Sequence, residues 1–145
     1  MEPPKTGHTC SEKYKSWAEE QIARCLDKHS IAYQYEYPLA LVDGGRVRLW
    51  YPDFRLPQYG LIIEYFGMVG KPSYDEQVCH KLAVYREAGI EGIFLTRESF
   101  RGYWPDRLLQ QIEDHLETRL RDFRAHRKNV ETYRQSGVLK PVYRT

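Results

Sequence analysis

The segment that decides the fold is Tyr51-Pro52-Asp53-Phe54-Arg55-Leu56-Pro57, followed after a turn by Leu61-Ile62-Ile63-Glu64-Tyr65-Phe66-Gly67. Both halves have the apolar pattern of a buried strand, and each contains one acidic residue, Asp53 or Glu64. The turn signal in residues 57–60 predicts that the two strands are neighbours. A buried carboxylate needs a cation, a hydrogen-bonding partner or a proton. We therefore expect Asp53 and Glu64 to converge, with a hard divalent ion such as Mg²⁺ between them; each alone has the alternative of an ion pair with a surface Arg.

Two polar residues on predicted helices are expected to join this pair. Lys81 lies four residues before Tyr85 on the apolar side of its helix. Its ammonium points either at the carboxylates and a phosphate or out to solvent. Glu19 lies on the same side of its helix as Ile22, whereas Glu20 is rotated from it by roughly 100°. Glu19 is therefore expected to face the sheet or the rim of the buried face, and Glu20 to face solvent.

The rest of the chain predicts an α/β fold with the order α-β-β-β-α-β-α. Helices are expected over residues 12–29, 73–88 and 105–135, and strands over residues 31–39, 47–56, 61–66 and 90–96. The turn Asp43-Gly44-Gly45 predicts a hairpin, and Ser73 with Glu76 predicts a capping box. The helical crossover to the last strand predicts a parallel pair. The result is a four-stranded mixed sheet flanked by helices, with a long C-terminal helix.

Length and composition exclude several classes of protein. A chain of 145 residues has room for one core and excludes a two-domain enzyme. Three cysteines, Cys10, Cys25 and Cys79, are too few and too unevenly spaced for a disulfide framework. There is no apolar run of about 20 residues and no apolar leader. These features predict a cytoplasmic protein with reduced thiols and no membrane partner.

The net charge of +2 conceals an uneven distribution of charged residues. Residues 1–118 carry 14 Lys and Arg against 18 Asp and Glu, whereas residues 119–145 carry 8 against 2. We expect a loose arm over residues 1–12, a folded domain over residues 13–118, and a basic helical extension and tail over residues 119–145. The extension either contacts nucleic-acid phosphates, stays solvated, or pairs with the acidic body of a second subunit.

The two strand segments, together with Ala18-Glu19-Glu20-Gln21-Ile22-Ala23 and Tyr35-Glu36, resemble the PD-(D/E)xK nuclease superfamily. The nearest members are very-short-patch-repair-like endonuclease domains and the similar domain of helicase IV-type proteins. The resemblance covers roughly residues 16–100 and implies the αβββαβα restriction-endonuclease-like core. One departure is that Phe66 stands where the family usually has its lysine. Lys81 on the neighbouring helix is expected to replace it, and Lys71 is the second candidate.

The resemblance implies a Mg²⁺-dependent endodeoxyribonuclease that nicks or cleaves DNA in repair, recombination, or phage and mobile-element biology. Asp53, Glu64 and the backbone carbonyl of Tyr65 would hold one or two Mg²⁺ ions, for which Mn²⁺ can substitute, and Glu19 would complete the shell. Lys81 would orient the attacking water or stabilise the developing charge. The alternatives are a catalytically impaired nucleic-acid-binding module on the same fold and an interaction subunit.

Several further residues are expected to contact DNA or to have a structural role. The predicted nucleic-acid contacts are Arg119, Arg121, Arg124, Arg127, Lys128 and Lys71, with Arg46, Arg48, Arg97 and Arg101 flanking the DNA. Tyr33, Tyr35 and Tyr37 alternate along one predicted strand, which favours a core or dimer face over a base-stacking platform. Zinc is disfavoured because the chain has no Cys-x-x-Cys pair. Assembly as a homodimer or within a larger repair or recombination complex stays open, as does cytoplasmic or nucleoid-associated localisation.

Overall fold

The computed structural model describes residues 13–137. The arm expected over residues 1–12, and residues 138–145 of the expected tail, lie outside the described residues. The chain divides into two compact units, Met1–Pro105 and Asp106–Thr145, and each is described by itself. Among the described helices, none combines the length and the apolar character that crossing a membrane requires.

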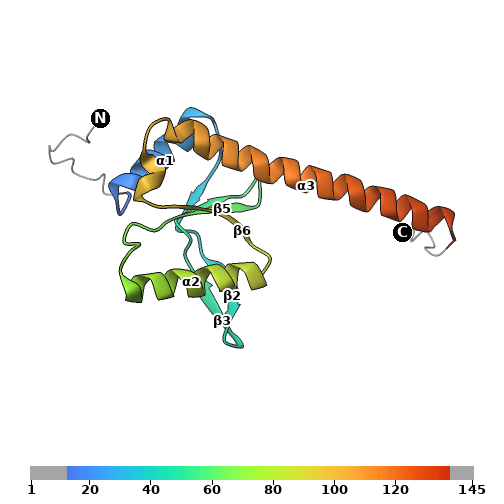
Figure 1. The fold of residues 1–145 in the computed structure, drawn as a ribbon, viewed down its shortest axis with the longest axis horizontal. Coiled ribbons are helices and arrows are strands. Elements are labelled where there is room, and N and C mark those ends of the chain that lie inside the picture. The colour runs from blue at the N-terminus through green and yellow to red at the C-terminus, as the bar shows by residue number, and fades with distance from the viewer. Residues whose placement is uncertain (1–12, 138–145) are drawn as a thin grey trace. The chain divides into compact units, whose positions relative to one another are not determined.

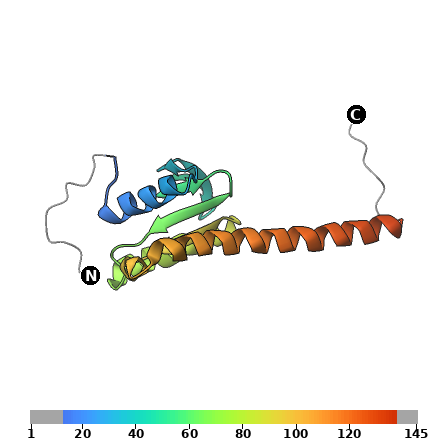
Figure 2. The ribbon, with the colours of Figure 1, turned by 90° about the horizontal axis from the view of Figure 1, so that it is seen from above.

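The main sheet has four strands in the order β1 (Gln34–Tyr35), β4 (Phe54–Leu56), β5 (Leu61–Tyr65) and β6 (Glu91–Leu95). Strands β4 and β5 are antiparallel, and β5 and β6 are parallel. The mixed sheet and its helical crossover confirm the predicted α/β fold class. Figures 1 and 2 show α1 and α2 on opposite sides of β5. Both faces of this strand are therefore buried, and its first four residues are all inaccessible to solvent.

Helix α1 (Trp17–Lys28) begins later than the predicted residue 12. Ser16, in an extended conformation, is the N-cap, and its side-chain oxygen accepts a hydrogen bond from the Glu19 N–H at 3.1 Å. This cap satisfies one of the amides that have no partner within the first turn. Ile22 and Leu26 are fully buried on the inner side of the helix, so the cap also fixes which side chains face the sheet.

The three strands predicted before the crossover are in fact five, and the expected strands over residues 31–39 and 47–56 are both wrong. Glu36 has a positive φ of 49°, which ends β1 after two residues. Pro52 has no N–H for a strand ladder, so the second long strand is also broken. Strands β2 (Leu39–Asp43) and β3 (Arg46–Trp50) form a separate two-stranded sheet.

The predicted hairpin turn at Asp43-Gly44-Gly45 is confirmed and joins β2 to β3. Gly44 and Gly45 have φ values of 60° and 76°, the pair of left-handed residues that a tight two-residue turn requires. One face of the hairpin contributes Leu41 to a small core with Ile62 of β5 and Tyr85 of α2. This packing attaches the two-stranded sheet to α2.

Helix α2 (Pro72–Glu87) begins one residue earlier than predicted, and the capping box at Ser73 is wrong. Lys71 is the N-cap and makes no side-chain cap bond, while Pro72 occupies the first turn, where its missing N–H costs nothing. The Asp75 carboxylate instead accepts a hydrogen bond from the Gly70 N–H at 2.9 Å. The predicted end is confirmed, since Gly89 has a φ of 70° just after the helix.

Helix α3 (Trp104–Gln135) follows a short 3₁₀ turn, η1 (Arg97–Phe100). Its bounds agree closely with the predicted helix over residues 105–135. The apolar face expected along the helix is buried only near its start, at Leu108 and Ile112. Leu120 and Phe123 are 48% and 59% exposed, so the later part of this face is open to solvent.

Candidate active site

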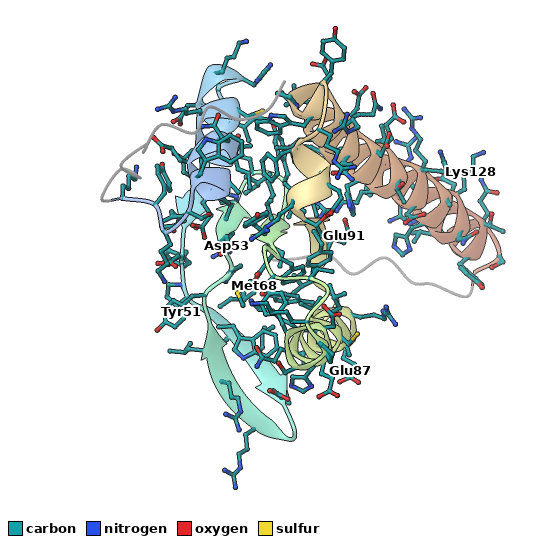
Figure 3. All side chains as sticks on the ribbon, turned by 60° about the vertical axis from the view of Figure 1, so that its left-hand side comes forward. Tyr51, Asp53, Met68, Glu87, Glu91 and Lys128 are labelled. Carbon is teal, nitrogen blue, oxygen red and sulfur yellow. The ribbon has the colours of Figure 1, made fainter. Side chains whose placement is uncertain are left out.

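Asp53 and Glu64 lie opposite each other at one end of the β4–β5 pair. The register pairs Phe54 with Ile63, and one more step of the ladder brings Asp53 to Glu64. Asp53 therefore immediately precedes β4, rather than lying inside a long strand. Its Oδ2 accepts a hydrogen bond of 2.7 Å from the Tyr65 N–H, which orients the carboxyl group. Figure 3 shows Asp53 between α1 and α2.

Glu64 is a buried acid, 2% exposed, whose two oxygens are both held by α2. Lys81 Nζ donates to Oε2 at 2.8 Å, and the Tyr85 hydroxyl donates to Oε1 at 2.5 Å. The Lys81 ammonium also lies 5.8 Å from the ring centre of Phe66. Lys81 of α2 therefore lies beside Phe66, the residue that stands where the family usually has its lysine.

Glu19 reaches the same cluster from α1 and is 6% exposed. Its Oε2 is buried and makes no hydrogen bond among the described residues. Glu20, by contrast, forms an ion pair with exposed Arg24 at 3.0 Å. A buried carboxylate oxygen without a partner is costly, so Glu19 marks a place where a cation or a hydrogen-bond donor would stabilise the protein.

Burial raises the pKa of the Asp53 carboxyl to about 7, well above its ordinary value. The Tyr65 N–H opposes this rise, while the negative charges of Glu64 and Glu19 add to it. Glu19 also favours the protonated form of Asp53 through a side-chain hydrogen bond. Three carboxyl groups from α1, β5 and the start of β4 are therefore close enough to compete for ionisation.

Sequence reasoning missed two tyrosines of α2 that belong to this cluster. Burial raises the pKa of the Tyr85 hydroxyl, and the charge on Glu64, to which it donates, adds to the rise. Burial also raises the pKa of Tyr74, with further contributions from Asp53 and Glu64. The spacing of four residues between Lys81 and Tyr85 signalled that both face the same way, but it did not show that both bind one carboxylate.

The donor set suits a hard divalent ion of the magnesium type held by few protein ligands. The described residues contain no group of three or more His, Cys, Asp or Glu side chains that could hold a metal. Mg²⁺ is commonly held by one or two carboxylates together with substrate phosphates and waters. Asp53 and Glu64 provide two carboxylates, the Tyr65 carbonyl is the third predicted ligand, and the unpartnered Glu19 oxygen is suited to a bound water.

The cysteines and histidines considered for zinc do not come together in the part of the chain that is described. Cys25 is buried and Cys79 is exposed. His80 instead lies 3.0 Å from Asp43 of the hairpin. Cys10 lies outside the described residues.

Among the predicted DNA contacts of the first unit, Lys71 and Arg97 line one open hollow beside the ends of β5 and β6, with a volume of about 220 Å³. Lys71 makes no hydrogen bond to Asp53 or Glu64, so the cation next to the carboxylates is Lys81. Arg48 lies 4.0 Å from Asp43 in the hairpin.

The five cations predicted on α3 do not share one side of the helix. Arg121, Arg124 and Lys128 line a common open hollow together with Glu117. At about 100° per residue, Arg119 lies on the other side of the helix and Arg127 lies in line with the exposed apolar side chains. Lys128 can be located on α3 in Figure 3. A phosphate-binding face on this helix would therefore consist of three cations.

The three alternating tyrosines do not share one environment. The rings of Tyr33 and Tyr35 both lie 5.5 Å from Phe54, as expected for core residues. Tyr37 is 44% exposed, and the guanidinium of Arg55 lies over its ring at 5.3 Å. The expectation that all three share one strand face is wrong, because the positive φ of Glu36 turns the chain between Tyr35 and Tyr37.

No family model, curated protein or solved structure matches the chain. Three acidic side chains, one ammonium and two phenols converge from four elements, and this combination can bind a cation and a phosphate group side by side.

Proposed function

We propose that the protein is a divalent-metal-dependent endodeoxyribonuclease of the PD-(D/E)xK type, hydrolysing phosphodiester bonds in DNA. The observation that supports this most is the arrangement around Glu64. The carboxylate faces Asp53 across the β4–β5 ladder and is bound by Lys81 from α2. An ammonium beside paired carboxylates is what a phosphate and its counter-ion require.

Asp53, Glu64 and the Tyr65 carbonyl are the proposed ligands of Mg²⁺ or Mn²⁺, with Glu19 acting through a water. When bound, the ion supplies positive charge to the phosphoryl oxygens and lowers the pKa of a bound water. Asp53 must lose its proton to serve as a ligand. Because its pKa is raised to about 7, ligand binding and activity should increase as the pH rises through neutrality.

The remaining residues of the cluster position the substrate and the nucleophile. Lys81 donates hydrogen bonds to the attacking water or to the phosphoryl oxygens, which stabilises the charge that develops on them. Tyr85 holds the Glu64 carboxylate from its other side and so fixes its direction. The face made by Arg121, Arg124 and Lys128 provides sequence-independent phosphate contacts. This function would place the protein in the cytoplasm or nucleoid, in DNA repair, recombination or mobile-element biology.

The proposal is tested by incubating supercoiled plasmid with the full chain and Mg²⁺ or Mn²⁺, with and without a chelator. We expect metal-dependent nicking that is lost in Asp53→Ala, Glu64→Ala and Lys81→Ala. Glu87→Gln, at the exposed end of α2 (Figure 3), is the matched acidic control and should retain full activity. Nicking that persists in the chelator or in the Asp53 and Glu64 variants would contradict the proposal.

A second candidate is a nucleic-acid-binding module without turnover. Both Glu64 oxygens are already engaged by Lys81 and Tyr85, which competes with any other ligand for this carboxylate. A mobility shift of DNA without nicking in any divalent metal would favour this candidate. The absence of both DNA binding and nicking would favour the third alternative, an interaction subunit.

A further inference from the structure

Helix α3 has a row of apolar side chains that is open to solvent. Leu116 is partly buried, while Leu120 and Phe123 are 48% and 59% exposed. Spacings of four and three residues place all three on one side of the helix. Large apolar side chains at this spacing on an otherwise charged helix are typical of a helix that pairs with another helix.

The charges beside this row change sign at Leu120. Glu113 and Glu117 precede it, and Arg124 and Lys128 follow it, all four exposed. At about 100° per residue, the four lie on one flank of the apolar row. Among the described residues, none of the four forms an ion pair. One end of the row is thus bordered by anions and the other end by cations.

We propose that α3 pairs with α3 of a second copy of the chain, in antiparallel orientation, with the two Leu120 side chains meeting at the centre. In this register Leu116 of each copy packs against Phe123 of the other. On the flank, Glu117 lies opposite Arg124 and Glu113 lies opposite Lys128. The pairing is isologous, so each of these contacts occurs twice. The complementary charges on this flank set the register and the orientation together.

A parallel dimer and bound DNA each account for fewer features of α3 than the antiparallel dimer does. A parallel dimer would bring flanking residues five positions apart together, so that Arg119 of one copy meets Arg124 of the other, which is unfavourable. Bound DNA would account for the cations but not for the exposed apolar row or for the two acidic residues beside it. Only about 16 residues per helix take part, so the dimer should be weak, in the micromolar range of dissociation constants.

The proposal is tested by sedimentation equilibrium of the full chain over a range of concentrations. Glu117→Arg and Arg124→Glu should each raise the dimer dissociation constant about tenfold or more, because each creates two like-charge pairs. The double variant should restore wild-type association. Asp114→Arg makes the same charge change on the opposite side of α3 and should have no effect. A chain that is monomeric throughout, or a double variant without rescue, would overturn the proposal.

Disulfide trapping tests the register in a chain with Cys10 and Cys79 replaced by Ser. Leu120→Cys should cross-link to itself under mild oxidation. Leu116→Cys should not, whereas a mixture of Leu116→Cys and Phe123→Cys should form the mixed dimer. Self-cross-linking of Leu116→Cys would indicate a parallel pair and overturn the antiparallel register. Neither experiment measures cleavage, so the result is independent of the proposed function.

Discussion

Glu64 is a buried acid, and each of its two oxygens meets a hydrogen-bond donor. An unpaired carboxylate in an apolar interior would be destabilising by several kcal/mol or would take up a proton. Here one oxygen meets the Lys81 ammonium and the other meets the Tyr85 hydroxyl. The surroundings of Asp53 do the opposite and favour its neutral form. Two acids in one cluster thus have different surroundings.

Removing the Lys81 ammonium should destabilise the fold as well as abolish nicking. Lys81→Met leaves the Glu64 charge buried, with an expected cost of about 2 kcal/mol because the lysine side chain is itself partly exposed. Lys81→Met with Glu64→Gln should recover most of this loss without recovering activity. Urea unfolding provides the measurement, and Lys28→Met on the exposed end of α1 serves as the control. Equal stability of the single variant and the wild type would show that the pair is not formed.

The raised pKa of Asp53 also predicts how stability changes with pH. Because the folded protein holds this proton up to about pH 7 while the unfolded chain releases it near its ordinary value of 3.8, stability should fall as the pH rises between these values. Asp53→Asn should remove that slope and stabilise the protein at pH 8 by about 2 kcal/mol, while abolishing nicking.

Thermal unfolding at pH 5 and pH 8, in the presence of a chelator, measures this effect. The other ionisable groups that interact with Asp53 are Lys15, Glu19, Glu64, Tyr74 and Tyr85. All of them remain in the Asn variant, so the difference between the two proteins isolates Asp53. An unchanged pH slope in Asp53→Asn would show that this carboxyl group is ionised throughout.

At the scale of elements, the cap of α1 determines how Glu19 is presented. Ser16 accepts a hydrogen bond from the N–H of Glu19 itself, so the first turn and the buried carboxylate are fixed together. Glu19 differs in this respect from the residues of β5, whose direction is set by ladders on both sides.

Ser16→Ala should therefore lower the free energy of unfolding by about 1 kcal/mol and reduce nicking. Ser73→Ala is the matched control because Ser73 lies in the first turn of α2 but is not its cap; its effect should stay within about 0.5 kcal/mol. Chemical denaturation of both variants gives the comparison. A larger effect at Ser73 would show that α2 begins with the capping box after all.

The strands were harder to predict than the helices. The prolines and glycines at the ends of α2 and α3 act locally, so the ends of these helices followed from the sequence to within one residue. The alternation over residues 31–39 is genuine, but a left-handed Glu36 interrupts it, and no local pattern specifies that conformation. Which sheet each fragment joins depends on distant partners such as Tyr85 on α2.

At the scale of the whole molecule, the convergence of Asp53, Glu64, Glu19 and Lys81 followed from polar residues that interrupt apolar patterns. The two tyrosines escaped this reasoning because a Tyr on an apolar helix face looks like an ordinary core residue until its hydroxyl has a partner. The spread of cations around α3 escaped it too, because five basic residues in a row of sequence need not share one side of a helix.

DNA binding should depend on the side of α3 as well as on its charge. The salt dependence of DNA binding reports the number of phosphate contacts. Replacing Arg121, Arg124 and Lys128 with Gln should lower that number by up to about three. Arg134→Gln, near the exposed end of the helix, is the single-charge control. Fluorescence anisotropy at several salt concentrations, with the protein dilute enough to be monomeric, makes the comparison. A triple variant with the wild-type slope would exclude this face.

Arg124 and Lys128 are shared between that DNA-binding face and the proposed dimer. Whichever partner engages them first leaves fewer cations for the other. Self-association at high concentration and DNA binding at low salt should therefore oppose each other.

The pairing of β1 with β4 bears on how such a protein changes over generations. Gln34 pairs with Arg55 and Tyr35 with Phe54, so residues 36–53 leave the sheet and return to it at the same place. The hairpin turn within this detour can lengthen or shorten at little entropic cost. At the end of β3, Trp50 stands edge-on to Tyr85 with ring centres 5.4 Å apart. Hairpins of other lengths can therefore evolve at the surface, provided that Leu41 and Trp50 still pack against Tyr85, whose hydroxyl holds Glu64.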